Sequence, residues 1–206
     1  PDNPLLPQAQ YNLLLIYLQL GETERYLQAS EAFLQTYQDV PYLPLVLYHL
    51  GEYYFQQEDY THALEVYTQL AGSYPQSELA DEAAYGIGLC HYRLQHYPEA
   101  LREFTAFVST FPQSNHVSDA RYAIATTYFR QADYEAAITH YSTLLEDFSD
   151  YPLHDRVLYN LGISLLKTEA FSDAVRILQL SVEQYPNQPN LMDVFLKLGY
   201  AYMQQR

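Results

Sequence analysis

The chain repeats itself every 37 residues, and this period constrains its fold more than any other feature. Two aromatic positions, one alanine position and one small-residue position all recur at that spacing. A period of this length is typical of architectures in which each unit buries its apolar face against its neighbours. The four columns are Tyr37, Tyr74, Phe111, Phe148 and Tyr185; Tyr60, Tyr97, Tyr134 and Phe171; Ala63, Ala100, Ala137 and Ala174; and Gly51, Gly88, Ala125, Gly162 and Gly199.

Each unit is predicted to contain two helices. Apolar residues between Leu47 and Tyr54 are spaced i, i+3, i+4 and i+7, as on one face of a helix. A polar segment at 56–59 follows, and a second set with helical spacing comes after it. Pro75 then ends the second helix, because proline cannot continue the backbone hydrogen bonding. We expect Ser77 and its equivalent, Ser114, to cap the next helix.

The small residues predict close helix crossings. Glycine inside a helix costs about 1 kcal/mol relative to alanine, so its recurrence indicates that packing compensates for it. We expect the glycine of each first helix to lie against the alanine of the second. The pairs are Gly51 with Ala63, Gly88 with Ala100, and Gly162 with Ala174.

The sequence Leu50-Gly51…Tyr54…Ala63…Tyr67…Pro75 resembles the tetratricopeptide repeat. The resemblance implies an all-α fold, a right-handed α-α superhelix of about five and a half helix-turn-helix repeats. It implies one array over residues 1–206, with repeats at about 4–38, 41–75, 78–112, 115–149, 152–186 and a partial one at 189–206.

The usual unit of this family has about 34 residues. The 37-residue variant resembles bacterial cell-envelope proteins of the BamD and Tol-Pal coordinator types, and implies a first helix longer by a turn. It also implies a periplasmic or outer-membrane location, with the cytoplasm as the alternative.

The charge and composition of the chain limit the kinds of partner and environment that suit it. Ten basic and 25 acidic residues give 10 − 25 = −15, a charge that repels phosphate backbones and disfavours nucleic acid. The longest apolar run, Leu13 to Leu18, is too short to span a bilayer. Cys90 is the single cysteine, so no disulfide framework is possible, and its position predicts a small buried apolar residue.

No catalytic pattern is present in the sequence. It contains neither a glycine-rich phosphate loop nor a nucleophile elbow. His91 and His96 are five residues apart, which would place them on different faces of one helix. We therefore expect no enzymatic activity, no metal and no cofactor.

A second set of columns predicts a partner-binding groove on the first helices. One column is Tyr11, Tyr48, Tyr85, Tyr122 and Tyr159, and another is Leu18, Phe55, Tyr92, Phe129 and Leu166. Beside the latter lie Arg93, Arg130 and Lys167, three of only ten basic residues. The predicted groove residues are Tyr48, Phe55, Tyr85, Tyr92, Arg93, Tyr122, Phe129, Arg130, Tyr159 and Lys167.

Two interpretations of these columns stay open. The aromatic residues can contact a ligand or pack between units, and the cations can bind an acidic or carboxylate-ended peptide or balance nearby acids. Chaperone-binding relatives carry asparagine in the groove. Here the corresponding positions are Glu52, Leu89, Thr126 and Ile163, which disfavours a chaperone-tail partner.

The two ends depart from the repeat. Leu14 stands in the glycine column and Tyr26 in the alanine column of the first unit, so we expect its helices to lie further apart. The last unit has one helix whose apolar face carries Phe195, Leu198 and Tyr202, which predicts a fragment of a longer protein with further domains.

The expected function is a protein-interaction module that binds a polypeptide in its concave groove, within a bacterial envelope assembly. The alternatives are a structural spacer and a cytosolic co-chaperone or adaptor.

Overall fold

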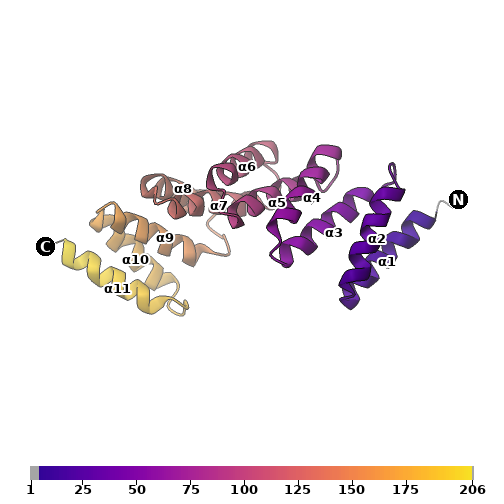
Figure 1. Ribbon diagram of the computed structural model, residues 1–206. Helices are drawn as coiled ribbons and strands as arrows, with labels where there is room; N and C mark the ends of the chain where they lie inside the picture. Colours follow the sequence, from indigo (N-terminus) through magenta and orange to yellow (C-terminus); the bar gives the residue numbers. More distant parts are fainter. Residues whose placement is uncertain (1–4, 206) are drawn as a thin grey trace. The chain divides into compact units, whose positions relative to one another are not determined.

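The computed structural model describes residues 5–205, which contain eleven α-helices and no strand (Figure 1). The all-α solenoid class expected from the repeat is confirmed. The chain forms two compact units, Pro1–Glu99 and Ala100–Arg206. The N-terminal unit contains α1 (Leu6–Leu20), α2 (Thr23–Thr36), α3 (Leu43–Gln56), α4 (Tyr60–Ser73) and α5 (Ala80–Arg93). The boundary falls within α6 (Tyr97–Thr110), and the C-terminal unit continues with α7 (Val117–Arg130), α8 (Tyr134–Asp147), α9 (His154–Lys167), α10 (Phe171–Gln184) and α11 (Leu191–Gln204).

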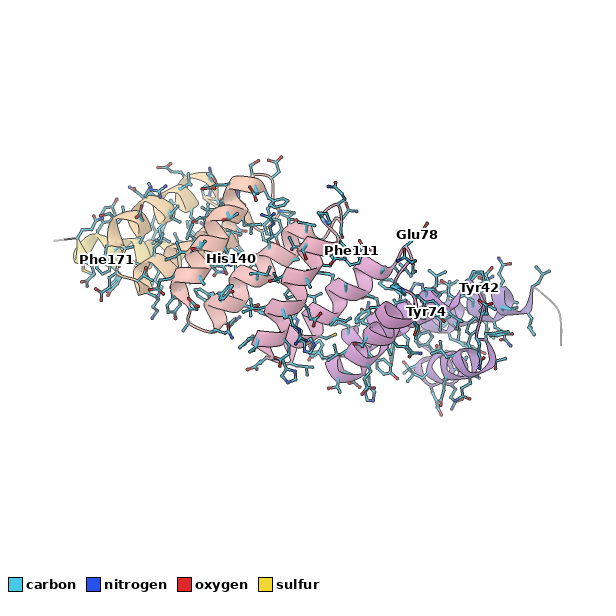
Figure 2. The ribbon with its side chains drawn as sticks, turned by 90° about the horizontal axis from the view of Figure 1, so that it is seen from above. Tyr42, Tyr74, Glu78, Phe111, His140 and Phe171 are labelled. Atoms are coloured by element: carbon cyan, nitrogen blue, oxygen red, sulfur yellow. The ribbon has the colours of Figure 1, made fainter. Side chains whose placement is uncertain are left out.

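The three residues that exceed the usual repeat length do not lengthen the first helix, so this expectation was wrong. The first helices α3, α5, α7 and α9 have 14 residues each, as do the second helices α4, α6, α8 and α10. The connections between repeats are instead well-formed turns, such as the one after α4 that carries Tyr74 and Glu78 (Figure 2). A hydrogen bond within the turn stabilises it, because the N–H of Ser77 donates to the Tyr74 carbonyl.

Ser77 does not cap a helix as expected. Its Oγ accepts a hydrogen bond from the Leu79 N–H at 3.2 Å, and Leu79 is itself the residue that precedes α5. Ser114 makes the same contact with the His116 N–H at 3.2 Å. The hydroxyl therefore stabilises the connecting turn, two residues before the site where an N-cap would act.

The turn inside each repeat contains a left-handed residue that the sequence did not reveal. Gly21 has φ of 70°, and four non-glycine residues at the same repeat position have φ of 59–61°. At Ala132, the following Asp133 N–H donates to the Tyr128 carbonyl at 3.0 Å, which closes the helix end as in a Schellman motif. The four non-glycine residues are Glu58, Gln95, Ala132 and Glu169.

The helices lie in two layers within each unit. Successive first helices contact each other directly, α3 with α5 in the N-terminal unit and α7 with α9 and α9 with α11 in the C-terminal unit. The second helices α2, α4, α8 and α10 each pack between the first helix before them and the one after, as α10 does between α9 and α11 (Figure 1). One face of the first helices is therefore left for other contacts.

Bulky side chains of the second helices lie over two of the repeated glycines, Gly51 and Gly162. A Cβ added to Gly162 would come within 2.5 Å of Leu178 Cδ2. The ring of Tyr67 is held between two glycines, because a Cβ at Gly51 would meet it at 2.6 Å and one at Gly86 at 2.8 Å. The expected close crossing is present, but Tyr67 and Leu178 are four residues beyond the alanine column, one turn further along the second helix.

Buried aliphatic and aromatic side chains form a core in each unit. In the C-terminal unit, Tyr141, Leu144 and Leu158 are at most 1% exposed and belong to one cluster. In the N-terminal unit, Leu14 and Tyr26 are both buried in a single cluster with Phe33. The residues that depart from the repeat in the first unit thus belong to its core.

Candidate polypeptide-binding surface

Three members of the tyrosine column pack against the next repeat along the chain. Tyr122 lies 5.7 Å from the Tyr151 ring, and the Tyr11 ring stacks on Tyr42 at 5.4 Å. The hydroxyl of Tyr159 in α9 donates to Asp193 in α11. These rings are half-buried. The packing interpretation therefore accounts for these three members, although their side chains remain partly exposed.

Burial also changes the acidity of this column. It raises the pKa of Tyr48 to about 12, with the nearby Glu52 and Glu82 as further causes. Burial and then the hydrogen bond to Asp193 raise the pKa of Tyr159 to about 12. Both hydroxyls are therefore donors at neutral pH.

The second aromatic column closes the turn within each repeat. Phe55 contacts Tyr60 edge-on at 5.1 Å, and Phe129 contacts Tyr134 in the same way at 5.8 Å. Tyr92 lies 6.1 Å from Tyr97. Each ring joins the end of a first helix to the start of the second, so this column has a structural role that does not depend on a ligand.

The three cations of the predicted groove are exposed at the ends of their first helices, Arg93 in the N-terminal unit and Arg130 and Lys167 in the C-terminal unit. Within residues 5–205, neither Arg93 nor Lys167 forms an ion pair with a carboxylate. On the second helices the situation differs, since Arg102 pairs with Glu103 at 2.7 Å and Arg176 with Asp173 at 3.3 Å. Arg93 and Lys167 are therefore exposed cations with no carboxylate of the described residues within ion-pairing distance.

The positions that replace asparagine hold the second helix. Glu52 accepts a hydrogen bond from the Tyr67 hydroxyl. Thr126 lies 3.1 Å from the hydroxyl of Tyr141, which also accepts from the Asn160 amide at 3.1 Å. These polar groups are thus occupied within the repeats.

A cavity of about 380 Å³ lies between α9 and α11 in the C-terminal unit. Lys167 belongs to the predicted groove, and Ile163 and Leu166 to its columns. The α11 residues were missed, although adding one period to Tyr159 and Ile163 leads to Leu196 and Tyr200. The lining residues are Ile163, Leu166, Lys167, Asp193, Leu196, Lys197 and Tyr200.

The placement of the two histidines was predicted wrongly. The His91 and His96 rings are 5.9 Å apart. They approach because α5 ends at Arg93 and the left-handed Gln95 reverses the chain between them. In the described part of the chain, no three His, Cys, Asp or Glu side chains gather where they could hold a metal ion. Cys90 is fully buried, as expected, and burial raises the pKa of its thiol to about 12.

None of the helices in the described range is both long and apolar enough to cross a membrane.

Comparisons with known proteins support the repeat assignment. The tetratricopeptide repeat family model matches residues 20–78, 48–115 and 122–189. No curated protein matches the chain. The chain belongs to the tetratricopeptide repeat family.

Several solved structures share the fold. A tetratricopeptide repeat protein from Parabacteroides merdae has a TM-score of 0.75 and 15% identity, over 96% of this chain and 77% of its own. MamA from Desulfovibrio magneticus has a TM-score of 0.72 and 18% identity, over 89% and 97%. Kinesin light chain TPR-like repeats from Podosopora anserina have a TM-score of 0.67 and 12% identity, over 92% and 100%. At these identities the likeness extends to the fold alone.

The family has a typical kind of function. Repeat arrays of this fold are typically non-enzymatic scaffolds that bind other proteins, and they do so through extended surfaces of stacked helices. Family membership supports such a function for this chain.

Proposed function

We propose that this protein is an interaction module that binds a polypeptide on the surface of its first helices. The observation that supports this proposal best is the position of Lys167. It is exposed, has no carboxylate partner within the described residues, and lines a cavity between two successive first helices. A cation held beside an apolar cavity is suited to a ligand that brings both an apolar and an anionic group.

The pathway is a finer proposal. The 37-residue period and its resemblance to BamD-like and Tol-Pal coordinator-like proteins favour a bacterial envelope assembly, in the periplasm or at the outer membrane. A spacer is the second candidate, because the tyrosine and phenylalanine columns are accounted for by packing within the repeats. A cytosolic adaptor would carry the same fold.

Charge reversal separates a binding surface from a spacer. Arg93, Arg130 and Lys167 are changed together to glutamate, and a second variant carries Arg102→Glu and Arg176→Glu on second helices. Both variants are used with the native protein to capture partners from cells, and captured proteins are identified by mass spectrometry. We expect a partner that is retained by the native protein and by the second variant, and lost from the triple variant.

Circular dichroism should show equal helicity in all three proteins, because exposed substitutions usually change stability by no more than about 0.5 kcal/mol. Raising the salt concentration should weaken capture by the native protein. Equal capture by the triple variant would mean that these cations are only solvated charges, and a spacer would then be the better assignment.

A further inference from the structure

We propose that the cavity between α9 and α11 is an anchor site for a polypeptide segment in which an apolar side chain lies next to a carboxylate. This inference depends on polypeptide binding at the first-helix surface, and it names the chemistry that the C-terminal unit recognises there. The residues on the α11 side had not been predicted from the sequence.

The walls of the cavity are apolar. Ile163 and Leu166 form the α9 side, and Leu196 and Tyr200 form the α11 side. Leu196 is 64% exposed and Tyr200 is 44% exposed, so both have apolar surface available to a ligand. Burial of such surface on both partners is the main favourable contribution to an anchor contact.

The size of the cavity selects the kind of ligand. Its volume of about 380 Å³ is at the lower end of the range for ligand sites, about 300–1,000 Å³. It accommodates a single large side chain with its adjoining backbone. A larger folded surface could contact only the rim.

The charges at the rim favour an anionic neighbour. Lys167 has no carboxylate partner within the described residues, and Lys197 Nζ is 3.8 Å from Asp193 Oδ1, a long ion pair. The other oxygen of Asp193 accepts the Tyr159 hydroxyl. Two lysines and one aspartate leave one net positive charge here, in a chain whose overall charge is −15. A carboxylate next to the bound apolar side chain would therefore be attracted to this part of the surface.

The test uses a fluorescein-labelled synthetic peptide, Gly-Ser-Leu-Glu-Glu-Ser-Gly, and fluorescence anisotropy. Two further peptides replace leucine by alanine or both glutamates by glutamine. We expect saturable binding of the first peptide and affinities about tenfold weaker for the other two, because each lacks one of the two recognised groups. Octanoate, which has an apolar chain and a carboxylate but no peptide backbone, is titrated in parallel.

Two variants on one helix provide the matched comparison. Leu196→Glu places a carboxylate in the cavity, whereas Met203→Glu changes a residue of the same helix that is 65% exposed and does not line it. We expect Leu196→Glu to weaken peptide binding about tenfold and Met203→Glu to leave it unchanged. Lys197→Gln should weaken binding of the peptide that carries the glutamates and leave binding of the glutamine peptide unchanged.

The outcomes that overturn the anchor site are specific. The leucine–glutamate peptide could fail to bind the native protein, or could bind the Leu196→Glu variant as tightly as the native protein. Met203→Glu could weaken peptide binding as much as Leu196→Glu does, or octanoate could bind more tightly than the peptide. None of these changes the charge-reversal result on Arg93, Arg130 and Lys167. Failure of the anchor site is therefore distinguishable from failure of the proposed function.

Discussion

Gly162 and Gly199 are one period apart, yet alanine at the two positions should have opposite effects on stability. In α9, a Cβ on Gly162 would come within 2.5 Å of Cδ2 and 2.8 Å of Cγ of Leu178, a side chain that is fully buried. In α11, a Cβ on Gly199 would meet no atom within 4 Å. The same substitution therefore adds a methyl group to a filled space in one case and to an open one in the other.

The magnitudes follow from two opposing effects. Replacing glycine by alanine within a helix gains about 1 kcal/mol in backbone free energy. Overpacking a filled core costs about 1–3 kcal/mol, and here Cγ as well as a terminal methyl of Leu178 would have to move. We expect Gly199→Ala to raise the free energy of unfolding by about 1 kcal/mol, and Gly162→Ala to lower it by up to about 2 kcal/mol.

Urea titrations followed by circular dichroism measure both changes. A double-mutant cycle tests the cause, because Leu178→Ala removes the atoms with which the new methyl would collide. In that background Gly162→Ala should be about 1–3 kcal/mol more favourable than it is alone, because the overpacking cost is removed. The explanation is refuted when Gly162→Ala stabilises the protein as much as Gly199→Ala, or when the two substitutions in the cycle are additive.

Three other predictions concern the interior and the turns. Tyr141→Phe should lower the free energy of unfolding by about 1–2 kcal/mol, because the lost hydroxyl contacts two polar side chains at 3.1 Å. Urea titration measures the change, and an unchanged free energy would mean that neither contact is formed. Ala132 has φ of 61°, a left-handed conformation that glycine adopts more easily than alanine, so Ala132→Gly should raise the melting temperature. Ala106→Gly, at an exposed position within α6, should lower the melting temperature, and equal effects of the two substitutions would contradict the left-handed turn. Cys90 is fully buried with its pKa raised to about 12, so at pH 8 it should react with a thiol reagent only through unfolding, and labelling at the rate of an exposed cysteine would exclude this burial.

A further prediction concerns alkaline pH. Burial raises the pKa of Tyr48 from 10.0 to about 12, so the folded state retains this proton after the unfolded state has lost it. The unfolded state then binds fewer protons, and stability should fall as the pH rises from 10 towards 12. In urea titrations across this range, Tyr48→Phe should show a smaller fall than the native protein, and an identical fall would assign the effect to other groups.

The sequence alone determined the helices and their pairing. The columns at Tyr60 and Ala63 recur at a fixed period, and each helix of 14 residues has the apolar spacing that local helix geometry requires. The burial of Cys90 was predictable for the same reason, since its position relative to Gly88 places it on the inward face. Periodicity records which face of a helix is apolar, and that is sufficient to predict a stacked array.

The candidate site was predictable only in part. The columns led to Lys167 and its neighbours on α9, because these residues recur with the period. Lys197 was missed because it has no counterpart among the predicted cations and enters the cavity only through the contact of α11 with α9. Whether the groove residues of the other repeats contact a partner stays a prediction.

The tertiary structure decided what fills each space between helices. The sequence showed that Gly51 and Gly162 allow a close approach, but not that the ring of Tyr67 lies between Gly51 and Gly86 while Leu178 covers Gly162. The proximity of His91 to a histidine five residues away likewise required a left-handed turn that no glycine marks. Spacing fixes the direction of a side chain around its own helix, whereas its neighbours depend on the crossing of two helices and on turn geometry, which only the folded chain determines.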